Sequence, residues 1–511
     1  MHHLLNLCFG YHIYMVGFEY KTKLTLGQSY LSGITDLKIG PNGILYAGSE
    51  HTDGVTTWSL GEGTVAQHVA SLEFAPWVGS RGLSDIEVTT IKEQTVLVPS
   101  GRYDDKMAYH RLDGSGLFES TKILSAPTQI VGHINESIFL KFGAKTYFLA
   151  SQQGVTGFKT FQVRDDLTMK YKRHVTDNTK ARIDDIDDID DMTAASLAGR
   201  QFVFMTSAAE DGVTAFWVQR WGNVKERGSA SPETGLYIDK PVALATATLD
   251  GKLYVIVAAA GSGSLSTLQV GAWGQLTPVD HVLDSLETRF DGVTALSVVT
   301  LNDRAFVIAG GADDGISLFE LSADGKLHHM SSIADQHGTT LNNISAITAT
   351  VVGSEIQVFV SSSAEQGITQ FTLDLNNLGT QITGTRNKDI LRGTDQDDLL
   401  VGYAGHDHLF GGRGDDRLID GKGVDRLTGG EGADTFVFKK DRRLDRIEDF
   451  EISVDKIDLS DFKGLHSIDQ ITFAKRDYGV LLKYADDRLA VEAADGRLLV
   501  SDFSADDFIF A

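Results

Sequence analysis

Short apolar stretches alternate with polar turns along the first three-quarters of the chain, and one block of sequence recurs among them. The block is a glycine followed by β-branched, small and aromatic residues, as in residues 212–216 (GVTAF) and 367–371 (GITQF). Copies begin at residues 54, 154, 212, 315 and 367, and weaker copies without the glycine begin at 106 and 264, so the spacing is about fifty residues. A regular period of this length is typical of architectures built from repeated supersecondary units.

Each unit contains enough apolar stretches for four short strands. One apolar run stands directly before the block, as at 253–257 (LYVIV), another precedes that run, as at 293–299, and a more polar run follows, as at 327–333. Asp-Gly turns often separate the second strand from the third, which is favoured hairpin chemistry. Four antiparallel strands per unit are the pattern of a propeller blade. The sequence therefore predicts an all-β fold with a seven-bladed β-propeller.

The seventh unit is one strand short. After 371–375 (FTLDL) the chain enters glycine-rich sequence, which leaves no room for a fourth strand. The apolar segment 19–26 precedes the first blade and has no other partner, and an open ring would expose sheet edges. We therefore expect residues 19–26 to close the ring, within a propeller of residues 19–381.

A second repeat follows, and it is only nine residues long. Glycine fills most of its first, second and fourth positions, as in residues 411–418 (GGRGDDRL), and an aspartate occupies its sixth. The aspartates are Asp389, Asp398, Asp407, Asp416, Asp425 and Asp434. A large apolar residue stands two positions after each, at Leu391, Leu400, Leu409, Leu418, Leu427 and Phe436. This is the nonapeptide of calcium-binding parallel β-rolls.

The chemistry of the repeat follows from its residue types. Glycine permits backbone conformations that aim carbonyl oxygens inward, and aspartate supplies carboxylate oxygens to a hard cation with six to eight oxygen ligands. Two nonapeptides complete one turn of the roll, so aspartates 18 residues apart stack on the same side. We expect Ca2+ to be held by all six aspartates. Asn387 and Gln396 replace the fourth glycine and Asp420 replaces a first glycine, so we expect weaker or empty sites at the early loops.

This tail resembles the repeats-in-toxin (RTX) proteins, whose calcium-binding tails leave the cell by type I secretion. The segments 432–438 (GADTFVF), 445–450 (DRIEDF) and 455–459 (DKIDL) look like the C-terminal domain of serralysin-type secreted proteins. The resemblance implies an RTX β-roll at 382–438 and a C-terminal type I secretion domain at 439–511. It also implies that the ending 506–511 (DDFIFA) is part of an uncleaved signal read by the ABC secretion machinery; an ordinary last strand is the alternative.

Charge and composition narrow the function further. The chain has 46 Lys and Arg against 70 Asp and Glu, a net charge of −24, which argues against nucleic acid as a partner. One cysteine, Cys8, excludes a disulfide framework, and no apolar run approaches the roughly 20 residues of a membrane span. The leader 1–18 lacks a basic start and a small-residue cleavage site, and Met15 is an alternative start. We expect an extracellular protein without a cleaved N-terminal signal.

The propeller carries no catalytic motif that we recognise. Its blade phrases resemble lactonase-type propellers only in strand pattern. Polar residues in the loops at one end of the propeller are candidates for catalysis or for anchoring a ligand. The run 184–191 (DDIDDIDD) makes the channel opening at that end acidic. The candidates are His51, Arg102, Arg289 and His337. Favoured turn chemistry explains most of these loop residues equally well. We interpret the protein as a secreted calcium-binding protein whose propeller binds a partner such as a surface glycan; the alternative is a lactonase-like hydrolase.

Overall fold

The computed structural model describes residues 17–26, 29–75, 81–103, 107–123, 133–176, 189–285, 287–373, 375, 377–494 and 496–510. These residues form two compact units, one over Phe18–Leu373 and one that begins at Asp374. The leader 1–16 and the acidic residues 184–188 lie outside the described residues. No helix in the described part of the chain is long and apolar enough to cross a membrane.

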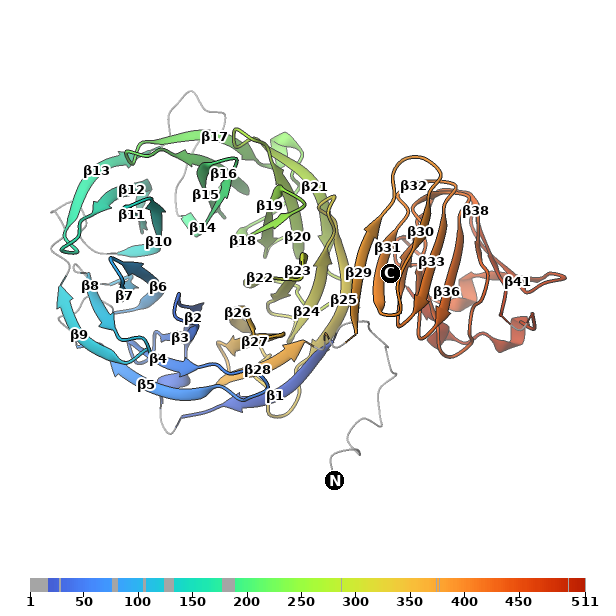
Figure 1. Ribbon diagram of the computed structural model, residues 1–511, viewed down its shortest axis with the longest axis horizontal. Helices are drawn as coiled ribbons and strands as arrows, with labels where there is room; N and C mark the ends of the chain where they lie inside the picture. The colour runs from blue at the N-terminus through green and yellow to red at the C-terminus, as the bar shows by residue number, and fades with distance from the viewer. Residues whose placement is uncertain are drawn as a thin grey trace. The chain divides into compact units, whose positions relative to one another are not determined.

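The first unit is a seven-bladed β-propeller, as the repeat predicts (Figure 1). Its described residues form seven four-stranded antiparallel sheets around a central axis. From the innermost strand outward, the first four blades are β2 (Ile34–Ile39), β3 (Ile44–Ser49), β4 (Gly54–Ser59), β5 (Gln67–Glu73); β6 (Leu83–Ile91), β7 (Gln94–Gly101), β8 (Ala108–Leu112), β9 (Phe118–Ile123); β10 (Ile134–Phe142), β11 (Lys145–Gln152), β12 (Val155–Val163), β13 (Met169–Val175); and β14 (Ile189–Leu197), β15 (Arg200–Ser207), β16 (Gly212–Val218), β17 (Val224–Ala230).

The remaining blades follow the same order. They are β18 (Pro241–Leu249), β19 (Lys252–Ala259), β20 (Ser264–Val270), β21 (Leu276–Leu283); β22 (Ala295–Leu301), β23 (Arg304–Gly310), β24 (Gly315–Leu321), β25 (Leu327–Ala334); and β26 (Ile344–Val352), β27 (Glu355–Ser362), β28 (Ile368–Leu373), β1 (Phe18–Leu24). Strand β1 pairs antiparallel with β28, and Figure 1 shows the two ends of the propeller chain side by side in the last blade. This pairing covers the outer edge of β28 and closes the ring.

The recurring block forms the third strand of each blade, and its apolar residues fill the space between neighbouring sheets. Tyr254 of β19 and Phe319 of β24, for example, share one core and are fully buried. Each blade has two ends. One end carries two hairpins, one between the first and second strands and one between the third and fourth strands, and we call it the turn end. We call the opposite end the loop end. The connections between blades lie at the loop end.

The second unit is a parallel β-roll that continues into a capping region, which comprises the described residues from 439 to 510. One sheet contains β29 (Leu378–Thr383), β31 (Asp397–Val401), β34 (Arg417–Ile419), β37 (Thr435–Val437), β39 (Lys456–Asp458) and β43 (Phe508–Ile509). The other contains β30 (Ile390–Arg392), β33 (His408–Arg413), β36 (Arg426–Glu431), β38 (Leu444–Ile447), β42 (Asp487–Val491), β41 (Val480–Tyr484) and β40 (Thr472–Lys475), and a short pair joins β32 (Ala404–Gly405) to β35 (Lys422–Gly423). Short 3-10 turns are η1 (Ser29–Leu31), η2 (Pro232–Thr234), η3 (Ile468–Gln470), η4 (Val500–Asp502) and η5 (Ala505–Asp507).

The apolar residues of the nonapeptides form the core of the roll. Leu391 pairs with Leu409 and Leu400 with Leu418, which confirms the stacking of strands 18 residues apart. All six apolar repeat residues belong to one buried cluster, which continues into the capping region through Ile447, Ile457 and Phe508. The chain ending is therefore a strand of this sheet, because Phe508 pairs with Ile457.

Candidate calcium sites and the propeller channel

The repeat aspartates stand where the loops of the roll enter their strands. Because the strands are stacked in parallel, aspartates 18 residues apart lie directly above one another. The backbone N–H of each donates to Oδ1 of the next: Asp389 to Asp407 at 2.8 Å, Asp398 to Asp416 at 2.8 Å, Asp407 to Asp425 at 2.7 Å and Asp416 to Asp434 at 2.9 Å. The structure thus brings together the same pairs that the sequence predicts.

Each ladder continues into the capping region beyond the nonapeptides. Asp425 donates its N–H to Asp445 at 3.0 Å, and Asp434 donates its N–H to Asp455 at 3.0 Å. The spacing there is 20 and 21 residues instead of 18. Asp445 and Asp455 are not among the ligands that the repeat predicts, because they fall outside its nine-residue register. Both residues lie in the segments 445–450 and 455–459, which resemble serralysin-type C-terminal domains, and this resemblance was the sequence signal that could have identified them.

The oxygen Oδ2 of the four later repeat aspartates is available to a cation. Oδ2 is buried and accepts no hydrogen bond in Asp407, Asp416, Asp425 and Asp434, and these side chains are at most 1% exposed. Burial raises the pKa of Asp416 to about 9 and that of Asp434 to about 8. A buried carboxylate without a partner is costly, and a hard cation that prefers oxygen ligands removes this cost. The residues therefore fit calcium.

The glycines of the repeat keep these oxygens accessible within a tight loop. A Cβ atom at Gly411 would lie 2.1 Å from Oδ2 of Asp416, and one at Gly429 would lie 2.1 Å from Oδ2 of Asp434. In these two loops, a side chain at the first repeat position would thus occupy the space beside the free carboxylate oxygen. The sequence requirement for glycine here is steric and concerns the ligand-binding space itself.

The first two aspartates have a different environment. Oδ2 of Asp389 accepts hydrogen bonds from the N–H and hydroxyl of Thr385 at 2.6 and 2.8 Å. Oδ2 of Asp398 accepts the same pair from Thr394 at 2.5 and 3.0 Å. A threonine at the second repeat position therefore satisfies the oxygen that is free in the later loops. Because these oxygens already have hydrogen-bond partners, a cation would stabilise the early loops less than the later ones. This effect is separate from the replacement of the fourth glycine by Asn387 and Gln396.

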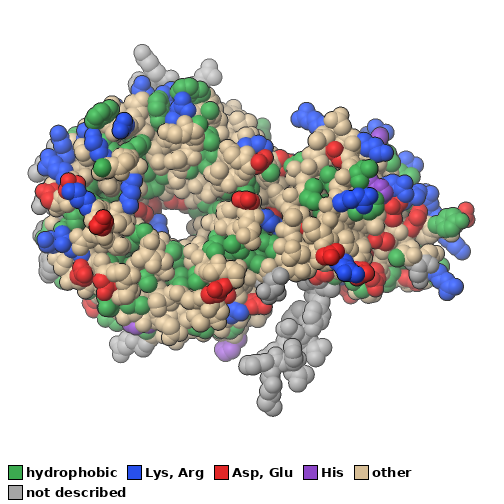
Figure 2. Space-filling view, viewed as in Figure 1, with side chains coloured by type: hydrophobic (Ala, Val, Ile, Leu, Met, Phe, Trp, Pro, Cys, Tyr) green, Lys and Arg blue, Asp and Glu red, His purple; other side chains and the backbone are tan. Residues whose placement is uncertain are grey.

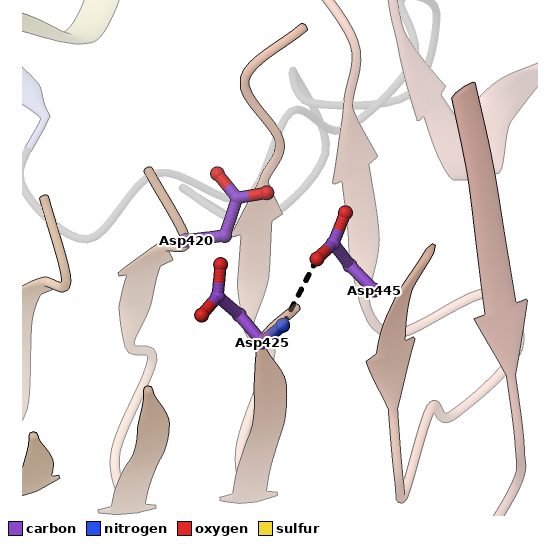
Figure 3. A group of neighbouring side chains, drawn as sticks. All are labelled: Asp420, Asp425 and Asp445. Atoms are coloured by element: carbon purple, nitrogen blue, oxygen red, sulfur yellow. Dashed lines mark hydrogen bonds between the residues drawn. The ribbon is translucent and has the colours of Figure 1, made fainter. Parts of the chain in front are cut away.

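Asp420 adds a carboxylate where the repeat usually has glycine. Oxygens of Asp420, Asp425 and Asp445 lie within 4.8 Å of one another, and all three residues are buried (Figure 3). Asp420 also accepts the N–H of Lys439 at 2.9 Å. Burial raises the pKa of Asp445 to about 7 and that of Asp425 to about 6. This departure from the repeat therefore increases the negative charge available to a cation at one loop.

Comparisons with known proteins agree with this geometry. The family of RTX calcium-binding nonapeptide repeats matches residues 383–418 in four copies. The C-terminal part is an RTX domain. The family of peptidase M10 serralysin C-terminal domains matches residues 406–494 of the same unit. The RTX domain and the serralysin-type C terminus are features of secreted calcium-binding proteins, as the sequence predicts.

Several solved structures are also similar. Virginiamycin B lyase from Staphylococcus aureus is 9% identical, with 70% of this chain and 99% of that chain covered and a TM-score of 0.44. A Lactobacillus plantarum protein is 17% identical, with 59% and 84% covered and a TM-score of 0.45. A subunit of the Azotobacter vinelandii mannuronan C5-epimerase is 34% identical, with 26% and 84% covered and a TM-score of 0.22. No curated protein matches the chain.

The propeller contains a charged cluster that sequence analysis missed. The innermost strands of four blades place one lysine and five carboxylates at the central channel, and Figure 2 shows acidic side chains beside the hollow of the ring. We call these residues the channel cluster: Asp36, Lys38, Asp85, Glu87, Glu136 and Asp191. The charged residues alternate with apolar ones in 34–39 (ITDLKI) and 83–88 (LSDIEV), and this alternation was the available signal.

Lys38 lies among the carboxylates. Its Nζ is 3.7 Å from Oδ2 of Asp36, 3.7 Å from Oδ1 of Asp85 and 3.5 Å from Oε1 of Glu87. Burial raises the pKa of Asp36 to about 7 and that of Glu87 to about 8, although Lys38 acts in the opposite direction. One ammonium group therefore does not balance the negative charge of the cluster.

Three of these carboxylates also join neighbouring blades. Asp36 accepts the N–H of Ile86 at 3.1 Å, Asp85 accepts the hydroxyl of Ser137 at 2.7 Å, and Asp191 accepts the N–H of Leu244 at 2.5 Å. Each contact links one innermost strand to the next. The acidic residue at the end of the run 184–191 thus has a structural role in the ring.

The four polar candidates at the loop end are dispersed. The ring of His51 packs on Gly33, the carbonyl of Arg102 contacts Nδ1 of His133 at 2.5 Å, and Arg289 lies 3.6 Å from Asp313. His337 is exposed in the connection between β25 and β26. Among the residues that the structure describes, no contact joins any of these four to another.

Proposed function

We propose that the protein leaves the cell through a type I (ABC) secretion machinery, that external calcium then folds its RTX domain, and that the propeller is a binding module. The observation that carries the calcium step is the row of buried carboxylate oxygens without hydrogen-bond partners. At low calcium these oxygens would be crowded with no cation between them. At about millimolar calcium, the cation binds the folded roll but not the unfolded chain, and this difference stabilises the folded state.

The calcium step is tested on the full chain. We expect calorimetry and far-UV circular dichroism to show one unfolding transition that requires calcium and one that does not. Magnesium should not replace calcium, because Mg2+ holds its own waters and demands octahedral geometry. A roll that is equally folded in chelator and in calcium would contradict the proposal.

The export step is tested in a bacterial host that carries a type I machinery. Because β43 belongs to the folded sheet, the machinery would read the ending before the roll folds. We expect deletion of residues 495–511 to retain the chain inside the cell, whereas the single substitution Tyr478→Ser, on an exposed residue of the capping region, should leave export unchanged. Equal export of both variants would remove this part of the proposal.

The binding role of the propeller is preferred to the hydrolase alternative. The four candidate residues at the loop end are dispersed, and the channel cluster joins blades. Assays of the full chain with a panel of lactones test the hydrolase alternative directly. Lactone hydrolysis that disappears in the variant Arg289→Gln would favour the hydrolase.

A further inference from the structure

The turn end of the propeller carries an unusual group of aromatic and basic residues. The group contains three of the five tryptophans of the chain, and these lie in two successive blades. We call this group the tryptophan patch. Its residues are Lys145, Arg200, Trp217, Trp221, Arg227 and Trp273.

The same arrangement occurs twice. Trp221, in the turn between β16 and β17, lies against Lys145 at the start of β11, with 4.0 Å between Nζ and the ring centroid. Trp273, in the turn between β20 and β21, lies against Arg200 at the start of β15, with 3.8 Å between the guanidinium carbon and the ring centroid. In both cases a turn tryptophan packs on a cation of the preceding blade.

The second pair is extended by two further residues. Trp217 contacts Trp273 edge to face, with 6.4 Å between the ring centroids and an angle of 77°. Arg227 lies 4.8 Å from the ring of Trp217, and its Nε is buried without a hydrogen-bond partner. The patch therefore combines adjoining aromatic faces with two guanidinium groups.

The two turns are held firmly in place. Gly222 and Gly274 follow the turn tryptophans with φ of 75° and 95°, in the left-handed region that favours glycine. A Cβ at Gly222 would lie 2.5 Å from the ring of Tyr147, and one at Gly274 would lie 2.8 Å from Phe202. The turns thus pack closely on the preceding blade, and this restricts the positions of the indoles before any ligand arrives.

The fold does not require tryptophan at these positions. The equivalent turn residues of four other blades are Gly63, Ser115, Asp166 and Asp324. Trp221 is 64% exposed and Trp273 is 51% exposed, so much of each indole faces solvent. Large exposed aromatic side chains beside arginine are characteristic of binding surfaces.

The arginines of the patch are not neutralised by acidic side chains of the described residues. The protein has a net charge of −24, yet in the described part of the chain neither Arg200 nor Arg227 forms an ion pair. Guanidinium groups bind carboxylates in a planar, two-pronged geometry. A local basic site on an acidic protein selects an anionic ligand by charge complementarity.

We propose that the tryptophan patch binds an acidic polysaccharide, with sugar rings packed on the indoles and sugar carboxylates paired with the arginines. The C–H face of a pyranose ring is flat and apolar, so it packs on an indole by hydrophobic and dispersion contact. Single-stranded nucleic acid also uses stacking and cations, but it requires a longer basic groove than these few cations provide. This inference rests on the proposed role of the propeller as a binding module and names its ligand class.

The test uses the full chain in saturating calcium with polygalacturonate, heparin, dextran and single-stranded DNA as probes, in calorimetry and affinity electrophoresis. We expect polygalacturonate to bind with an affinity that falls as salt rises, and dextran not to bind. Trp273→Ala and Arg200→Gln should each weaken polygalacturonate at least about tenfold, since a central aromatic or arginine anchor carries a large share of binding energy. The matched control is Tyr237→Ala, because Tyr237 is 74% exposed in a connection at the loop end, and it should bind as the wild type does.

A second readout does not depend on how the variants fold. Polygalacturonate should change the tryptophan fluorescence of the wild-type chain with the same midpoint as binding. No binding of polygalacturonate, tighter binding of DNA than of either acidic polysaccharide, or equal effects of Trp273→Ala and Tyr237→Ala would overturn the inference. Binding of heparin supports it, because heparin also carries sugar carboxylates. The calcium-dependent unfolding transition is measured on the same samples. If that transition is present while binding is absent, this inference fails and the calcium part of the proposed function stands.

Discussion

The backbone N–H of Asp398 donates to Oδ1 of Asp416 at 2.8 Å, and Oδ2 of Asp416 is left buried without a hydrogen-bond partner. One oxygen of the carboxylate thus fixes the distance between two turns of the roll, and the other is available to a cation. The same division recurs through the central loops. Ligand binding and the stacking of turns therefore depend on the same side chains.

Replacing Asp416 should weaken calcium binding more than replacing Asp389. Asp416→Asn keeps an acceptor for the N–H of Asp398 but removes the charge, so we expect the calcium midpoint of folding to rise about tenfold or more. Asp389→Asn should shift it less, because Oδ2 of Asp389 already accepts two hydrogen bonds from Thr385. Calcium titration followed by circular dichroism measures both midpoints. Equal shifts would contradict the assignment of the free oxygens.

Removing Thr394 should make an early loop depend on calcium. Thr394→Gly restores the glycine of the repeat and deletes the hydroxyl contact to Asp398. We expect the free energy of unfolding in chelator to fall by about 1 kcal/mol, the net value of a typical hydrogen bond. In saturating calcium the loss should be smaller, because a cation takes over the oxygen. Thr472→Gly, at an exposed position of β40 in the capping region, is the control and should show no such difference between chelator and calcium.

The channel cluster should make the propeller less stable as pH rises. The pKa of Asp191 is raised to about 6, that of Asp36 to about 7 and that of Glu87 to about 8, chiefly by burial. The folded state therefore binds more protons than the unfolded state, and stability falls between about pH 4 and pH 8. The charged groups that face one another there are Asp36, Lys38, Asp85, Glu87, Glu136 and Asp191.

Thermal unfolding of the calcium-insensitive transition measures this effect, with calcium saturating so that the RTX domain does not contribute. Glu87→Gln should reduce the pH dependence, because it removes one of the titrating groups. Glu119→Gln, an exposed carboxyl on β9, should leave it unchanged. A transition temperature that rises from pH 5 to pH 8 would show that the sign is wrong.

A buried ion pair in the sixth blade should be sensitive to single substitutions. Arg304 donates to both carboxylate oxygens of Glu320, at 2.7 and 2.6 Å, and their side chains are 4% and 0% exposed. Glu320→Gln leaves a buried guanidinium without its counter-charge, so we expect a loss of about 3–5 kcal/mol in denaturant unfolding. The double variant Arg304→Met, Glu320→Leu should recover most of the loss. No recovery would indicate that the two side chains act separately.

Local pattern alone predicts the architecture of both units. Strand periodicity and the block at about fifty residues identify the seven blades, because each blade needs the same sequence of strands and turns. The nine-residue register identifies the aspartates and their partners, since a parallel roll repeats every 18 residues by construction. In these cases neighbours in space are set by a fixed spacing in the chain.

Contacts without a fixed spacing were decided by the tertiary structure. Lys38 meets Glu87 because ring geometry brings the innermost strands of two blades together, and Trp273 meets Arg200 because one turn packs on the preceding blade. Thr394 satisfies Asp398 through a loop conformation that the repeat pattern does not specify. A repeat pattern determines where strands and loops occur, whereas the charge balance of a channel or the composition of a surface depends on which side chains the closed ring places within a few ångströms.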